Sequence, residues 1–225
     1  MFQTIFLDLD DTLLDFGAAE RVAITKTFTD IGIEPTPALL RRYSEINQSQ
    51  WEALERGEIT RETVLVRRFA ILFSELGTAH DPAATEDIYR AYLGVGHYFV
   101  PGAEALLSYL APKYDLYLAS NGVAQTQYSR LESAGIGHYF KDIFISETTG
   151  HHKPERAYFD YCFAHIDGFD PARALMIGDS LTGDVLGGKN AGIKTCWFNP
   201  KHKPRRADIV PDFEVDRLDA LRQLL

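Results

Sequence analysis

The chain has 225 residues, of which 45% are hydrophobic and 24% are charged, and its formal net charge is −9. A chain of this length buries enough apolar surface to fold without a disulfide or a structural metal. Its basic residues form no run longer than two. Because nucleic acids and anionic membrane surfaces are bound through extended basic patches, we expect neither as a partner.

The amino-terminal segment reaches an acid at position 8 with no basic region before it, so we do not expect a signal peptide. No apolar run approaches the roughly 18 residues of a membrane span. We therefore expect a cytoplasmic protein. Its two cysteines, Cys162 and Cys196, are expected to be buried thiols in a reducing compartment, with a disulfide between them as the alternative. The sequence carries no signal for an oligomeric state.

The first predicted element is a short apolar strand over residues 4–9, after which no strand pattern follows for about a hundred residues. Apolar residues then recur at helical spacing, and prolines and glycines mark the helix ends. The predicted helices cover residues 24–31, 37–56, 65–76 and 82–93. We interpret residues 16–96 as one all-helical insertion that forms a small second domain.

From residue 101 onward, predicted helices and strands alternate. They are helix 103–110, strand 116–119, helix 125–134, strand 143–146, helix 155–165, strand 174–177, helix 184–190 and strand 194–198. This alternation predicts the α/β class, with a Rossmann-like parallel sheet that carries helices on both faces. Residues 1–15 and 97–225 would form this core. The segment 201–212, rich in proline and charge, is expected to be a surface loop.

Polar side chains follow four of the predicted strands, where parallel sheets bind their ligands. They are Asp8 and Asp10 after the first strand, Ser120 and Asn121 after the second, Lys153 after the third, and Asp179 and Asp184 after the fourth. Each signal alone is explained by a turn, a helix cap or a solvated charge, but their joint placement indicates one site. Because several converging carboxylates need a cation, the site is expected to hold Mg²⁺.

Four motifs in this order, DxDxT at 8–12, Ser-Asn-Gly at 120–122, Lys-Pro at 153–154 and GDxxxxD at 178–184, resemble the haloacid dehalogenase-like (HAD) superfamily and its aspartate-nucleophile phosphatases. The resemblance implies a catalytic α/β core, a helical cap at 16–96 and a covalent aspartyl-phosphate. It implies that Asp8 is the nucleophile and Asp10 the general acid and base. It also implies that Mg²⁺ is held by Asp8, the Asp10 main-chain carbonyl and Asp179, and that Asp184 supports the metal shell and Lys153. The phosphoryl oxygens would be held by Ser120, Asn121 and Lys153.

A closer resemblance lies outside these motifs. Segments such as Gly57-Glu58-Ile59-Thr60, Arg130-Leu131-Glu132 and Thr195-Cys196-Trp197 are similar to the bacterial house-cleaning pyrimidine 5′-nucleotidases. This similarity implies a small phosphorylated substrate, namely a pyrimidine nucleoside monophosphate. The aromatic residues Phe16, Trp51 and Tyr92 are then interpreted either as cap core or as the lining of the substrate entrance.

Other activities remain as alternatives. A sugar-phosphate or phosphoglycolate phosphatase, or a phosphoglucomutase relative, would use the same motifs with different cap residues. Dehalogenase chemistry is disfavoured because the dehalogenase branch lacks the second aspartate of DxDxT. Phosphonate hydrolysis would need a cap lysine near the site, and residues 16–96 contain a single lysine, Lys26. A non-enzymatic phospho-receiver module also uses acids, a hydroxyl and a lysine around Mg²⁺. In such modules, however, the acceptor aspartate follows the third strand, and no 80-residue insertion is present.

Overall fold

The computed structural model describes residues 2–225, and the chain divides into two compact units. The sheet unit comprises the chain up to Phe16 together with His97–Leu225, and the helical unit comprises Gly17–Gly96. None of the described helices is long and apolar enough to cross a membrane. Both cysteines, Cys162 and Cys196, are free thiols and buried, as expected.

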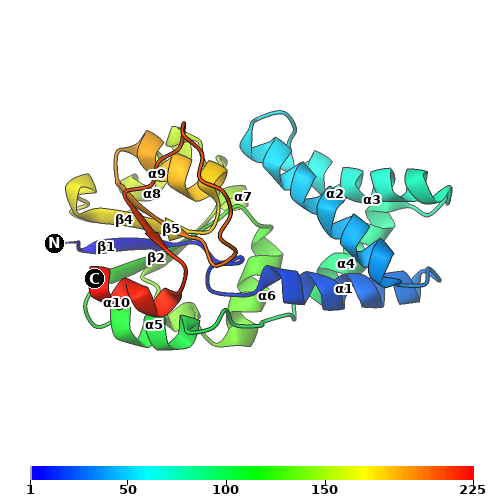
Figure 1. Ribbon diagram of the computed structural model, residues 1–225, viewed down its shortest axis with the longest axis horizontal. Coiled ribbons are helices and arrows are strands. Elements are labelled where there is room, and N and C mark those ends of the chain that lie inside the picture. Colours follow the sequence, from blue (N-terminus) through cyan, green and yellow to red (C-terminus); the bar gives the residue numbers. More distant parts are fainter. Residues whose placement is uncertain (1) are drawn as a thin grey trace. The chain divides into compact units, whose positions relative to one another are not determined.

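Within residues 2–225, six strands form one parallel sheet in the order β3-β2-β1-β4-β5-β6 (Figure 1). The strands are β1 (Thr4–Leu7), β2 (Asp115–Ser120), β3 (Asp142–Ile145), β4 (Ala174–Gly178), β5 (Lys194–Phe198) and β6 (Phe213–Val215). β1 lies between β2 and β4, at the point where the strand order reverses direction. Sheets of this order bind ligands beside that reversal, at the carboxyl ends of the strands.

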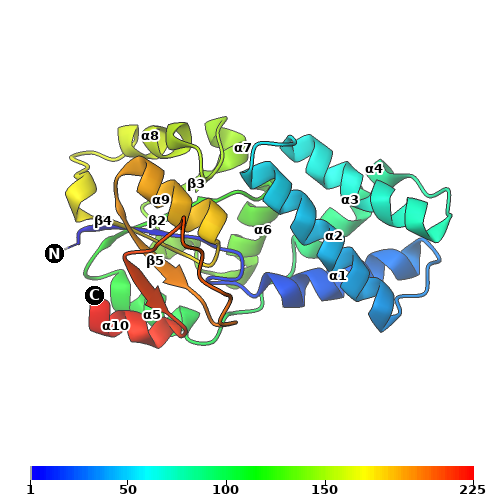
Figure 2. The same cartoon turned by 45° about the horizontal axis from the view of Figure 1, so that its top comes forward.

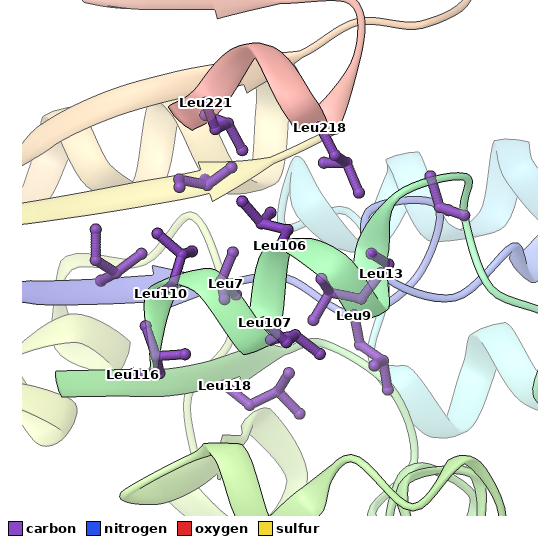
Figure 3. Packing of buried hydrophobic residues seen from close by; sticks show 14 of the residues in the cluster. Leu7, Leu9, Leu13, Leu106, Leu107, Leu110, Leu116, Leu118, Leu218 and Leu221 are labelled. Carbon is purple, nitrogen blue, oxygen red and sulfur yellow. The ribbon is translucent and has the colours of Figure 1, made fainter. Parts of the chain in front are cut away.

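Helices cover both faces of the sheet, which confirms the predicted fold class (Figure 1). They are α5 (Ala103–Leu110), α6 (Ala124–Ala134), α7 (Ser146–Thr149), α8 (Arg156–Ala164), α9 (Leu186–Ala191) and α10 (Leu221–Leu224), with 3-10 helices η1 (Gly137–Tyr139), η2 (Pro171–Arg173) and η4 (Leu218–Ala220) and the π-helical turn η3 (Leu181–Val185). Successive side chains of β1 point to opposite faces. Leu7 therefore packs among the leucines of β2, α5 and the carboxyl-terminal helices (Figure 3), in the same cluster as Ile5. Phe6 packs on the opposite face, against α8.

The helical unit is built from helices α1 to α4 (Figure 2). They are α1 (Phe16–Asp30), α2 (Pro37–Glu55), α3 (Arg61–Leu76) and α4 (Pro82–Leu93). Side-chain oxygens of Thr36, Thr60 and Asp81 cap the amino termini of α2, α3 and α4, which explains where these helices begin. The unit's interior contains Tyr43, Phe69 and Tyr89, whose rings pack within 6 Å of one another.

Several elements differ from the sequence-based prediction; the first helix, for example, begins at Phe16 rather than at residue 24. β1 ends at Leu7 rather than residue 9, so Asp8 lies together with Asp10 in the loop after the strand. The three-residue edge strand β6 and the short helix α7 were not predicted, because neither is long enough to show a periodic pattern. The predicted helix 184–190 instead consists of η3 followed by α9.

Candidate active site

Lys153 lies between two carboxylates at the carboxyl end of the sheet. Its ammonium nitrogen is 2.7 Å from Asp8 Oδ1, 2.6 Å from Asp184 Oδ1 and 2.7 Å from the main-chain oxygen of Ala119. The side chains of Asp8, Asp184 and Lys153 are all buried, and Lys153 is only 3% exposed. Because an ammonium has three hydrogen-bond donors, each finds one acceptor here. Burial opposes the charge of Lys153, but Asp184 and Asp8 outweigh it and raise the lysine's pKa.

The backbone around Lys153 is held by Asn121. The Asn121 side chain accepts a hydrogen bond from the Lys153 amide and donates one to the Lys153 carbonyl, both at 2.8 Å. This pair of bonds joins the loop after β2 to the segment that follows β3. The sequence predicted that Asn121 binds phosphoryl oxygens. In the structure it positions Lys153, and direct phosphate contact stays a prediction.

Asp10 points to helix α6 rather than to Lys153. Arg130 donates to Asp10 Oδ1, and Gln127 Nε2 donates to Asp10 Oδ2 at 2.7 Å. The same Gln127 nitrogen donates to Ser120 Oγ at 2.8 Å. The structure therefore brings Asp10 and Ser120 together through a helix for which the sequence predicted no part in the site.

Three carboxylates form a group that could hold a metal ion. One oxygen from each of Asp8, Asp179 and Asp184 lies within 4.8 Å of the others. Burial raises the pKa of Asp8, Lys153 opposes that rise, and the nearby acids Asp184, Asp10 and Asp179 add to it. Burial likewise raises the pKa of Asp179 to about 6.

The pKa values of Asp8 and Asp179 are raised, so a further cation beside these carboxylates would favour their charged forms. Carboxylate oxygens are also the ligands that Mg²⁺ prefers. The donor set therefore fits the predicted ion. The structure adds the carboxylate of Asp184 to the predicted pair Asp8 and Asp179. The Asp10 main-chain carbonyl stays a predicted ligand.

Two lysines from the predicted surface loop also contact the acidic groups. Lys203 Nζ lies 3.0 Å from Asp179 Oδ2, and Lys201 Nζ lies 3.2 Å from Asp11 Oδ2. Asn199 positions the first of these by accepting from the Lys203 amide at 2.8 Å. Neither lysine could be assigned to the site from the sequence, because a basic, proline-rich segment is typical of a solvated loop.

Comparisons with known proteins show the family of this chain. The family model for haloacid dehalogenase-like hydrolases matches residues 2–192. HAD-hydrolase YfnB from Bacillus subtilis is 44% identical over 224 residues, covering 100% of this chain and 95% of the relative. Its crystal structure with bound magnesium has a TM-score of 0.96 and covers 100% of this chain and 98% of that one.

Two further relatives are pyrimidine 5′-nucleotidases. PynA from Streptococcus pneumoniae is 38% identical and covers 98% of this chain and 95% of the relative. YjjG from Escherichia coli is 31% identical and covers 98% of this chain and 96% of the relative. These matches extend over nearly the whole sequence, including the four motifs at the strand ends. The chain therefore belongs to the haloacid dehalogenase-like hydrolases.

Proposed function

We propose that the protein is a Mg²⁺-dependent phosphomonoesterase that acts through an aspartyl-phosphate on Asp8. The sheet unit is the catalytic core in this proposal, and the helical unit is the cap. The observation that carries it is the buried Asp8 carboxylate, hydrogen-bonded to Lys153 and grouped with Asp179 and Asp184 at the reversal of strand order. A carboxylate nucleophile divides one difficult displacement into two easier steps.

In the first step, an Asp8 oxygen forms a bond to phosphorus while the bond from phosphorus to the ester oxygen breaks. Asp10 donates a proton to that leaving oxygen. In the second step, Asp10 removes a proton from water, whose oxygen bonds to phosphorus. The acyl-phosphate bond breaks, releasing inorganic phosphate and the Asp8 carboxylate.

Most of the barrier reduction in phosphoryl transfer comes from positioning and charge. Lys153 supplies an ammonium at the nucleophile, and Ser120 supplies a hydroxyl donor at the end of β2. Asp8 and Asp179, with Asp184, would hold Mg²⁺, which would supply further positive charge to the phosphoryl group. The magnesium-bound structure of the relative YfnB supports this part of the proposal.

The proposed substrates are pyrimidine nucleoside 5′-monophosphates. Support comes from the names of the relatives PynA and YjjG, which cover nearly all of this chain. The net charge of −9 favours a small monophosphate over a polyanion. Phe16, Trp51 and Tyr92 stay candidates for contact with the base. A cytoplasmic location is part of the same proposal.

The test is a comparison of kcat/KM for the monophosphates of deoxyuridine, thymidine, adenosine and guanosine with phosphoglycolate and hexose phosphates. We expect the two pyrimidine nucleotides to be the best substrates. Equal or better values for purine nucleotides or hexose phosphates contradict the pyrimidine assignment and leave the phosphatase assignment standing. Absence of phosphate release from every compound, with Mg²⁺ present, contradicts both.

A further inference from the structure

Gln127 and Arg130 of helix α6 are buried polar side chains that the chemistry described above does not use. Arg130 is 0% exposed and Gln127 is 1% exposed, although an isolated arginine is costly to bury. They lie three residues apart on one face of the helix, and Arg130 Nη1 donates to Gln127 Oε1 at 3.2 Å. The cost of burying these two side chains must therefore be offset by their interactions with other groups of the sheet unit.

Both side chains act on the Asp10 carboxylate. Arg130 donates to Oδ1, and Gln127 donates to Oδ2 at 2.7 Å, so each carboxylate oxygen is held by a donor from the same helix. The Arg130 guanidinium also lies 5.8 Å from the centre of the Phe16 ring, which limits its movement on another side. Two points of attachment fix the direction of a carboxylate as well as its place.

Gln127 also determines how Ser120 can interact. Ser120 Oγ accepts from the Gly122 amide at 3.1 Å and from Gln127 Nε2 at 2.8 Å. A hydroxyl has two acceptor sites and one hydrogen, so these bonds leave its hydrogen to be donated. A phosphoryl oxygen accepts hydrogen bonds, so it needs a donor of this kind. Gly122 makes this arrangement possible, because a Cβ there would lie 2.5 Å from Gln127 Nε2.

We propose that Gln127 and Arg130 are positioning residues that hold the Asp10 carboxylate for proton transfer to the leaving group, and that Gln127 couples this carboxylate to Ser120. The inference rests on the proposed phosphomonoesterase function. It goes beyond that function by placing the control of the proton donor on α6. Loss of Arg130 should then lower kcat/KM most for substrates whose leaving oxygen most needs a proton.

The test compares two aryl phosphates of similar size that differ in this need. 4-Nitrophenolate leaves readily without a proton, whereas phenolate is a poorer leaving group. The quantity to measure is kcat/KM, because it reports the steps through cleavage of the ester bond. Since general acid catalysis contributes about 10²–10⁴-fold, we expect Arg130→Met to lower kcat/KM for phenyl phosphate about 10-fold more than for 4-nitrophenyl phosphate.

Two further variants separate positioning from damage to the fold. Gln127→Leu removes the second donor and should show the same selectivity, together with a higher KM for both substrates because Ser120 loses its partner. Leu131→Ala, at a buried position of the same helix, should lower thermal stability and change both kcat/KM values by the same factor. Gln127→Leu decides the question if Arg130→Met does not fold.

Each outcome has a separate meaning. Equal losses on the two phosphates in Arg130→Met and in Gln127→Leu, or no loss in either variant, overturn the positioning role while the wild-type protein remains a phosphatase. A wild-type protein that releases phosphate from neither compound contradicts the proposed function itself. Restoration of the phenyl phosphate rate by Arg130→Lys, relative to Arg130→Met, supports a charged donor to Asp10 as the property that matters.

Discussion

Replacement of Lys153 by methionine should destabilise the sheet unit strongly in the absence of metal. The change keeps a long apolar side chain but removes the ammonium, which makes hydrogen bonds of 2.6, 2.7 and 2.7 Å to Asp184, Asp8 and the Ala119 carbonyl. Two buried carboxylates then lose their cation. Removal of one partner from a buried ion pair costs about 3–5 kcal/mol, a large part of the roughly 5–15 kcal/mol that stabilises a domain.

The measurement is urea unfolding in EDTA, followed by the fluorescence of Trp197 in β5. A Trp51→Phe background is needed, because Trp51 is the other of the two tryptophans and lies in the helical unit. The double variant Lys153→Met/Asp184→Asn should recover part of the loss, since it removes one of the unpaired charges. Lys141→Met, at a lysine whose side chain is 66% exposed, is the matched control and should unfold like the parent. A loss below about 1 kcal/mol for Lys153→Met refutes the reasoning and makes Lys153 equivalent to a surface lysine.

Three further predictions follow from the same site. Chelation by EDTA should abolish activity and Mg²⁺ should restore it; activity that persists in EDTA excludes a required metal. Burial raises the pKa of Asp179 from an ordinary 3.8 to about 6, so a proton competes with Mg²⁺ as the pH falls below 6; calorimetry should show the Mg²⁺ dissociation constant rising about tenfold per pH unit there, and a constant value contradicts Asp179 as a ligand. Gly178→Ala should weaken Mg²⁺ binding, because the new Cβ would lie 2.1 Å from Asp184 Oδ2 and displace that carboxylate; unchanged affinity, measured in the same titration, argues against Asp184 as part of the metal shell.

The sheet and the polar groups at its edge could be predicted because both depend on short segments of sequence. Alternating helices and strands predict a parallel sheet, and a parallel sheet brings every strand's carboxyl end to one edge. The contacts of Lys153 with Asp8 and Asp184 follow from that topology. The fold class and this part of the site therefore needed no knowledge of tertiary structure.

The contacts of helix α6 and of the carboxyl-terminal loop could not be predicted in the same way. Gln127 and Arg130 are typical residues of an exposed helix face, and their burial depends on Asp10, which is more than a hundred residues away in the sequence. One signal was present, because both residues share a helical face with the apolar residues Val123 and Leu131. Polar residues on an apolar face indicate buried partners, but the sequence does not say which partners these are.

The loop lysines, Lys201 and Lys203, carried even less signal. Their segment contains prolines and charges in no periodic pattern, which is typical of a solvated loop. The placement of Lys203 beside Asp179 depends on Asn199, whose side chain binds the Lys203 backbone. It also depends on β6, which follows the loop and pairs with β5. A strand of three residues is too short for periodicity to reveal it.

The most direct test of the proposed mechanism is to look for phosphate on Asp8. Wild-type protein is mixed with a substrate and Mg²⁺, quenched in acid within the first turnover, digested and examined by mass spectrometry. The mechanism predicts one phosphoryl group on the peptide that contains Asp8 in the wild-type protein, and none in Asp8→Asn, which should also be inactive. Phosphate release without a phosphorylated Asp8 peptide, or substantial turnover by Asp8→Asn, contradicts it.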